Sequence, residues 1–130
     1  MQIVFGRVCL RVKNHVSSYA YYHDMLALRD IFTWNRKDSS GTLFQVGTGI
    51  IEILEEHLPE NREPCDTPMS VNKVEVDLQV DQVDTMYETL KDRGLEIPAP
   101  PEDKPWGMRQ FYILDPDGVR IVFMQPINVR

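Results

Sequence analysis

With 130 residues, the chain has the length of one ordinary domain, which leaves no room for a separate catalytic or regulatory module. Its composition, 42% hydrophobic and 26% charged residues, is typical of a soluble globular protein, and no apolar run is long enough to span a bilayer. The formal charge is -6 and no Lys/Arg cluster is present to neutralise phosphates, so we expect neither a membrane nor a nucleic-acid partner.

The N-terminal segment interrupts its apolar run with Arg7 and Arg11, unlike the continuous apolar core of a secretory signal. We therefore expect a cytoplasmic protein. Cys9 lies in a predicted strand and Cys65 in a proline-rich loop, and the sequence has no CxxC motif. Free thiols are the expectation, rather than a disulfide or a zinc site.

An approximate internal repeat organises the chain into two halves. Residues 7–12 and 75–80 both alternate polar and apolar side chains, which predicts a strand with two different faces. Each strand runs into a helical pattern whose apolar residues lie three and four positions apart. These residues are Val16, Tyr19, Tyr22 and Leu26 in the first half, and Val83, Met86, Tyr87 and Leu90 in the second.

The second helix carries signals at both of its ends. Asp81 can accept a hydrogen bond from the first free amides, and Asp84 suits the positive end of the helix dipole. Gly94 can adopt the left-handed conformation that ends a helix. We therefore expect this helix to begin after Asp81 and to end before Gly94.

Shorter strand-like runs follow each helix. They cover residues 30–36, 42–46 and 50–55 in the first half, and 95–98, 109–115 and 119–125 in the second. Hairpin signals stand at Thr48-Gly49 and at Asp115-Pro116-Asp117-Gly118. Each half therefore reads βαβββ, which predicts an α+β fold.

The loops set the predicted domain organisation. We expect residues 1–130 to form a single domain, with module one at 1–58, a proline-bearing linker at 59–70 and module two at 71–127. Residues 98–107 contain four prolines and predict a second, stiff loop.

Four segments, taken in order, resemble the signatures of the vicinal-oxygen-chelate superfamily, which includes glyoxalases, bleomycin resistance proteins and extradiol dioxygenases. The segments are GRVCLRVKNHVSSYAYYHDMLAL, GTGIIEILEE, VEVDLQVDQVDTMYETLKDRGL and PWGMRQFYILDPDGVRIVFMQ. The last is the most specific, because an aromatic strand, a DPDG turn and a final strand recur there in the family. The resemblance implies two βαβββ modules that form a curved mixed sheet around a cavity for a small-molecule ligand, and pairing of the chain as a homodimer.

Metal-dependent members of this superfamily place four ligands in the cavity, and the resemblance carries these positions onto Arg7, Glu52, Glu75 and Val122. Arginine has no accessible lone pair and valine has no donor atom, so two of the four cannot bind a metal. Two carboxylates alone would hold a hard ion such as Mg²⁺ or Mn²⁺ only with several waters. We therefore expect no cofactor, and a divalent metal, if bound, would depend on Glu52 and Glu75.

The alternation of side chains also predicts two charged rows. Arg7, Cys9 and Arg11 share one strand face, and Glu75, Asp77 and Gln79 share the matching face in the other half. Two interpretations stay open. The rows form structural ion pairs that satisfy buried charge, or Arg7 or Arg11 binds a ligand carboxylate or phosphate while Glu52 or Glu75 acts as general base.

Aromatic residues and histidines complete the candidates. Trp106 is expected at the cavity rim, either stacked on a ligand or covering the edge of the core. The residues assigned to the core rather than to a ligand are Tyr22, Trp34, Phe44, Met108, Tyr112 and Met124. The three histidines, His15, His23 and His57, match no metal motif and are expected at solvated positions.

Two function classes follow. The leading hypothesis is a metal-independent small-molecule binding protein of the bleomycin-resistance type, with ligand contacts from Arg7, Arg11, Glu52, Glu75 and Trp106. The alternative is a metal-dependent lyase, epimerase or dioxygenase of the same superfamily, in which Glu52 and Glu75 are the candidate catalytic residues. One scaffold hosts many chemistries, so the fold does not choose between them.

Overall fold

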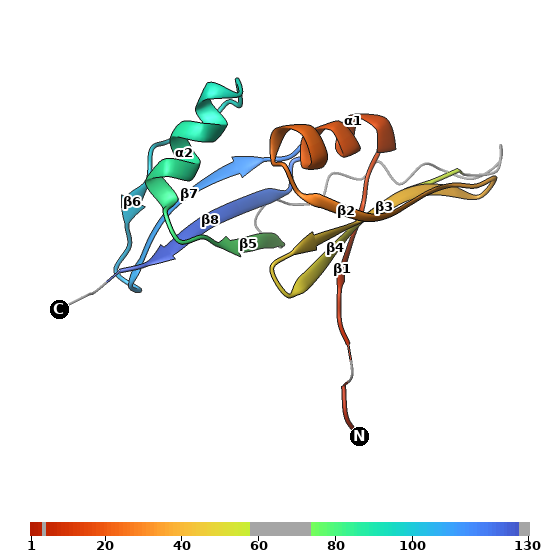
Figure 1. Cartoon of the computed structure of the whole chain (residues 1–130), viewed down its shortest axis with the longest axis horizontal. Helices are drawn as coiled ribbons and strands as arrows, with labels where there is room; N and C mark the ends of the chain where they lie inside the picture. The colour runs from red at the N-terminus through yellow and green to blue at the C-terminus, as the bar shows by residue number, and fades with distance from the viewer. Residues whose placement is uncertain (4, 58–73, 128–130) are drawn as a thin grey trace. The chain divides into compact units, whose positions relative to one another are not determined.

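A computed structural model describes residues 1–3, 5–57 and 74–127, so the predicted linker, including Cys65, lies outside the described residues. The chain divides into two compact units, Met1–Thr67 and Pro68–Arg130. Each unit contains a four-stranded mixed sheet with helical structure on one face (Figure 1). The predicted α+β fold of two βαβββ modules is confirmed. None of the described helices is long and apolar enough to cross a membrane.

The sheet of the first unit, called sheet 1, has the strand order β1-β4-β3-β2. Its strands are β1 (Val8–Arg11), β2 (Arg29–Asn35), β3 (Ser39–Val46) and β4 (Gly49–Glu56). Strand β1 runs parallel to β4, and the other neighbours are antiparallel. The parallel pair needs a crossover, which the helical segment supplies. All four strands lie at the predicted places.

The helical segment of the first unit changes character along its length. It begins as α1 (His15–Tyr19), where the side chain of Asn14 accepts a hydrogen bond from the Ser17 amide at 2.9 Å. It continues as a π-helical stretch, η1 (Ala20–Met25), ahead of Leu26. The spacing of apolar residues predicts the helix but not this wider turn. The buried Tyr22 ring packs 5.9 Å from that of Phe44, which confirms both as core residues.

The sheet of the second unit, called sheet 2, has the order β5-β8-β7-β6. Its strands are β5 (Glu75–Gln79), β6 (Glu102–Asp103), β7 (Met108–Leu114) and β8 (Arg120–Pro126). The strand predicted at residues 95–98 is wrong, because the chain pairs with β7 only at Glu102 and Asp103. Pro98, Pro100 and Pro101 have no amide hydrogen to donate to a ladder, so pairing begins after them.

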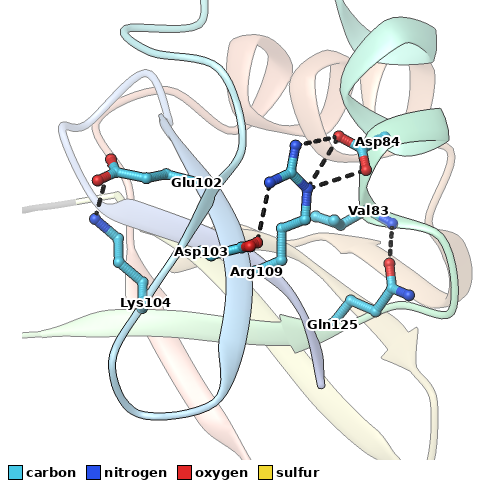
Figure 2. Close-up of polar contacts among 7 residues, drawn as sticks. All are labelled: Val83, Asp84, Glu102, Asp103, Lys104, Arg109 and Gln125. Carbon is cyan, nitrogen blue, oxygen red and sulfur yellow. Dashed lines mark hydrogen bonds and ion pairs between the residues drawn. The ribbon is translucent and has the colours of Figure 1, made fainter. Parts of the chain in front are cut away.

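Helix α2 (Val83–Asp92) covers one face of sheet 2 (Figure 1). The prediction that Asp81 caps it is wrong, because the residue at the cap position is Gln82. Instead, the amide of Val83 donates to the side-chain oxygen of Gln125, on β8, at 2.9 Å (Figure 2). A side chain distant in sequence therefore satisfies the helix start. Gly94 has φ of 87°, as its predicted role at the helix end requires.

Arg109 on β7 joins three elements of the second unit (Figure 2). Its guanidinium donates to both carboxylate oxygens of Asp84 in the first turn of α2, and its Nη1 lies 3.0 Å from Asp103 on β6. These hydrogen bonds, first that to Asp84, raise the pKa of Arg109 above its already high ordinary value. These contacts of Arg109 with Asp84 and Asp103, called the clamp, hold α2 and the short edge strand β6 against β7.

Tight turns close the two hairpins. In the second unit, the Asp115 carboxylate accepts from the amides of Asp117 and Val119 at 2.9 and 2.8 Å, and Gly118 has φ of 84°. This turn is confirmed. In the first unit, Gly47 has φ of 57° and lies directly after β3, so the turn residues are 47 and 48, one position earlier than predicted.

Candidate functional site

The two faces of each sheet differ in what covers them. In sheet 1, the rings of Tyr19 and Tyr22 contact Phe44, so the face that includes Phe44 is covered by the helix. In sheet 2, the ring of Tyr87 on α2 lies 5.5 Å from that of Phe111. Since side chains alternate along a strand, the other residues form the helix-free face of each sheet. By this alternation, Arg11 and Glu52 lie on the helix-free face of sheet 1 and Glu75 lies on that of sheet 2, while Arg7 and Trp106 lie just outside the strands.

Glu52, on β4, is the centre of a polar group in sheet 1. Its carboxylate lies 3.1 Å from Nε of Arg7, just before β1, and Glu52 is only 7% exposed. Cys9 is its register partner on β1. Burial, and then the charge and hydrogen bond of Glu52, raise the pKa of the Cys9 thiol above its ordinary value. The thiol is therefore protonated at neutral pH and is a poor nucleophile.

Arg11, on the same face of β1, forms an ion pair with Glu56 at the end of β4. Both arginines of the predicted row are therefore partnered by carboxylates from the neighbouring strand of their own sheet. Sequence reasoning placed Glu52 in the candidate site but missed Glu56. The period of two along β4 relates Glu52 to Glu56 and is the signal that could have found it.

Glu75 and Asp77 on β5 form the second acidic group, on the helix-free face of sheet 2. The hydrogen bond with Asp77 raises the pKa of Glu75, and burial and the charge of Asp77 act in the same direction. The positive charge of Arg120, the register partner of Glu75, lowers that pKa. The net effect is a raised pKa, so Glu75 keeps its proton to a higher pH than an isolated glutamate does.

Arg120 and Tyr112 are functional candidates that sequence reasoning missed. The Arg120 guanidinium carbon lies 4.0 Å from the centroid of the Tyr112 ring, and Nε of Arg120 is buried without a hydrogen-bond partner among the described residues. Tyr112, assigned to the core, is only half-buried. The signal available was spacing: Arg120 stands two residues before Val122, so both side chains share one face of β8.

The two tryptophans, Trp34 on β2 and Trp106 in the turn before β7, contact equivalent strand positions, Gly41 on β3 and Gln110 on β7. In sheet 2, Trp106 is 63% exposed, and its indole N–H donates to the side-chain oxygen of Gln110 at 3.1 Å. In sheet 1, Trp34 lies flat over Gly41, where an added Cβ would come within 2.3 Å of the indole. Trp34 is half-buried and stacks against Phe32, which is 51% exposed, so this pair is not fully in the core as expected for Trp34.

The histidines make more polar contacts with other side chains than expected. His15 is half-buried, and its Nε2 lies 2.8 Å from the hydroxyl of the fully buried Thr42, so the prediction that it is solvated is wrong. Burial lowers the pKa of His15, although the charge of Glu55 opposes this. One carboxylate oxygen of Glu55 accepts a hydrogen bond from the backbone amide of His15 at 2.7 Å, and the other lies 3.3 Å from Nε2 of His57. Glu55 joins the two histidines because alternation on β4 turns it toward the face that carries α1.

The family's metal positions do not provide a fitting donor set. Arg7 places a guanidinium against Glu52, and Val122 is 2% exposed and offers no donor atom. Among the described residues, no group of three or more His, Cys, Asp or Glu side chains is arranged to hold a metal ion. The residues at these positions therefore favour an internal cation, the Arg7 guanidinium, over a coordinated one.

A hollow of about 500 Å³ lies in the second unit beside the start of α2. Its lining includes Gln79, Asp81, Gln82 and Met86. None of the five residues predicted to contact the ligand lines it. The hollow therefore excludes Glu52 and Glu75 and meets the predicted row of β5 only at Gln79.

Comparisons with known proteins agree with this architecture. The family model described as Glyoxalase/Bleomycin resistance protein/Dioxygenase superfamily matches residues 4–123. No curated protein matches the chain. Among solved structures, the fosfomycin resistance protein FosX from Listeria monocytogenes has a TM-score of 0.71 at 20% identity, over 96% of this chain and 94% of that one.

Two further solved structures are similar over most of their length. A glyoxalase/bleomycin resistance protein/dioxygenase from Nocardioides has a TM-score of 0.73 at 20% identity, covering 100% of this chain and 87% of that one. A glyoxalase family protein from Enterococcus faecalis has a TM-score of 0.69 at 18% identity, covering 91% and 94%. At these identities the likeness shows the fold.

Proposed function

The chain belongs to the glyoxalase/bleomycin resistance protein/dioxygenase superfamily, and we propose that within it the chain is a metal-independent protein that binds a small molecule. We further propose that it acts in the cytoplasm as a homodimer. Size-exclusion chromatography with light scattering tests the dimer, for which a mass of twice 15.1 kDa is expected.

One observation carries the proposal of metal independence: the 3.1 Å ion pair between Arg7 and Glu52. A metal at this position would need a lone pair from residue 7, and a guanidinium has none. Arg7 instead supplies a positive charge beside the buried carboxylate. The Arg7 side chain is 47% exposed, so its remaining donors are available to a carboxylate or phosphate.

Other polar groups on the helix-free faces suit ligand contacts. Arg11 is exposed on the same strand as Cys9, and Glu75 offers a carboxyl group from β5. Trp106 presents an exposed indole on which a planar ligand could stack. A binding protein needs no group poised for chemistry, and the protonated Cys9 thiol agrees with that.

A second candidate function, an enzyme, is favoured by the carboxyl pair of Glu75 and Asp77. Their shared hydrogen bond raises the pKa of Glu75, the direction that prepares a carboxyl group to act as general acid or base near neutral pH. Glu52 is less suited to this role, because the Arg7 guanidinium holds its carboxylate. The lyase, epimerase and dioxygenase alternatives would therefore depend chiefly on Glu75.

Metal loading and a ligand panel together test the proposal. We expect no stoichiometric Mg²⁺, Mn²⁺, Fe²⁺, Ni²⁺ or Zn²⁺ by elemental analysis after incubation and dialysis. A panel of anionic, neutral and cationic small molecules should contain compounds that raise the thermal midpoint equally with and without EDTA. One metal per chain that disappears in Glu52→Gln but persists in Glu56→Gln would overturn the proposal. A panel without any binder would overturn it as well.

A further inference from the structure

Arg120 differs from the other arginines of the helix-free faces and of the clamp. Arg7, Arg11 and Arg109 each lie against a carboxylate. Nε of Arg120 is buried without an acceptor among the described residues, and the guanidinium acts on its register partner Glu75 only through its charge. A buried donor without a partner destabilises the folded protein. Such a group calls for a physical explanation, and an absent ligand is one.

The guanidinium is nevertheless held in place. The guanidinium carbon lies over the Tyr112 ring, 4.0 Å from its centroid, and this contact restrains the guanidinium group. The Cα atom of Arg120 is held in β8, between its register partners Leu114 and Glu75. A stacked guanidinium keeps its N–H donors in the plane of the group, where a carboxylate or phosphate can accept two of them together. Tyr112 therefore presents Arg120 as a preorganised fork, with little side-chain freedom to lose on binding.

Gln110 supplies a second donor on the same face of β7 as Tyr112. The indole N–H of Trp106 donates a hydrogen bond to the side-chain oxygen of Gln110 at 3.1 Å. Because an indole N–H can only donate, this contact fixes which end of the Gln110 amide faces it. The amide nitrogen of Gln110 is then the remaining donor of that side chain. Two residues along a strand separate the Cα atoms of Gln110 and Tyr112 by about 7 Å, a span suited to a small ligand.

Apolar side chains lie between these polar groups. Tyr112 is the register partner of the buried Val122, and Gln110 is the partner of Met124. The face therefore combines a cation at one end, an apolar middle and an indole with an amide at the other. A small molecule with an acidic head and an apolar body would match this order of groups.

We propose that Arg120, stacked on Tyr112, binds the oxyanion of a small organic acid whose apolar body lies along Tyr112 and Met124 toward Gln110 and Trp106. This inference rests on the proposed function and names its ligand class. The carboxyl groups of Glu75 and Asp77 do not occupy this donor: Glu75 is the register partner of Arg120, yet Nε of Arg120 has no acceptor among the described residues.

Four probes that share a phenyl ring and differ in head group test the inference: benzoate, phenylphosphonate, neutral benzamide and cationic benzamidine. By isothermal titration calorimetry, at least one anion should bind the wild-type protein ten-fold or more tightly than benzamide. The comparison of benzoate with phenylphosphonate distinguishes a carboxylate from a phosphate-like head. Arg120→Met should remove the preference for the anion, whereas Arg93→Met, which removes the same charge from the end of α2, should retain it.

Stability measurements separate this role from a structural one. Because Arg120→Met deletes a buried donor without a partner, its thermal midpoint should equal or exceed that of the wild type. Should that variant fail to fold, Arg120→Lys keeps the charge without the planar fork and should bind the anion at least five-fold more weakly. Unchanged anion affinity in either folded variant overturns the inference, as does equal binding of benzoate, phenylphosphonate and benzamide. Those results leave the proposed function standing, since the wider ligand panel decides it separately.

Discussion

The two sheets share one register but differ in the chemistry at equivalent positions. In sheet 1, Cys9 on β1 pairs with Glu52 on β4. In sheet 2, Asp77 on β5 pairs with Val122 on β8. At this pair of positions the carboxylate is on the last strand in the first unit, as Glu52, and on the first strand in the second unit, as Asp77. The backbone repeat is therefore conserved between the halves while its polar side chains are not.

The consequence is a different charge balance on each helix-free face. Sheet 1 neutralises its arginines internally, through the pairs of Arg7 with Glu52 and Arg11 with Glu56. Sheet 2 pairs its carboxyl groups with each other and leaves Arg120 on an aromatic ring. On a face with internal ion pairs, the charged side chains already have partners of opposite charge. A face with an unsatisfied buried donor is better prepared for a ligand.

The largest effect on stability is expected at Gly41, where the surroundings of Trp34 differ from those of Trp106. By register, Gly41 of β3 corresponds to Gln110 of β7, since they pair with Leu54 and Met124. Gly41→Ala would place a Cβ within 2.3 Å of Trp34 and 2.7 Å of the Ile53 carbonyl oxygen. Chemical denaturation should show a loss of about 3 kcal/mol in the free energy of unfolding.

Gly49→Ala is the matched control for that substitution. Its added Cβ would meet the Val46 carbonyl oxygen at an ordinary 3.5 Å. We expect a change of less than about 1 kcal/mol. Equal effects of the two substitutions would contradict the close packing of Trp34 on Gly41.

A smaller effect is expected from the Arg109 clamp of sheet 2, which has no counterpart among the described residues of sheet 1. Arg109→Met removes the contacts with Asp84 and Asp103 that join α2 and β6 to β7. Because these groups are partly exposed, we expect a loss of about 1 kcal/mol by chemical denaturation. Lys104→Met, which breaks the single exposed pair with Glu102, should cost less than about 0.5 kcal/mol. A clamp variant no less stable than the Lys104 variant would refute the role assigned to Arg109.

Glu52→Gln tests the internal neutralisation of sheet 1 through the neighbouring thiol. Glu52 raises the pKa of Cys9 by charge and hydrogen bonding, so its neutral isostere should lower that pKa while the effect of burial remains. In a Cys65→Ser background, the thiol should react faster with a disulfide reagent at pH 8. Glu56→Gln, which removes the partner of Arg11, is the control and should change this rate less. No increase with Glu52→Gln would show that the carboxylate does not act on Cys9.

The smallest effect is expected at Glu75, which is exposed. Its pKa is raised above the ordinary 4.5, so the folded protein holds the proton more tightly than the unfolded chain does. The free energy of unfolding therefore falls as the pH rises through the window between 4.5 and the raised pKa. The Glu75→Gln variant should lack this pH dependence. At a pH above the raised pKa, it should be slightly more stable than the wild type. Glu88→Gln on α2 should leave the dependence in place, and its loss there would contradict the assignment.

Much of the fold was predictable because it depends on local patterns. Alternating side chains placed β1 and β5, apolar spacing placed both helices, and the Asp115–Gly118 turn closed where its residues predicted. One error arose where a distant group decided the outcome: Gln125 on β8 satisfies the start of α2, which made Asp81 unnecessary as a cap. The other was local, because Pro98, Pro100 and Pro101 delayed β6 to Glu102.

The sequence by itself determined which residues share a strand face, because a period of two is a property of the extended chain. It could therefore group Arg7, Cys9 and Arg11, and separately Glu75, Asp77 and Gln79. Only the tertiary structure decided the partners, since a strand register joins residues far apart in the chain. That register brought Glu52 to Arg7 and Cys9, gave Glu56 to Arg11, and left Arg120 stacked on Tyr112 without an acceptor.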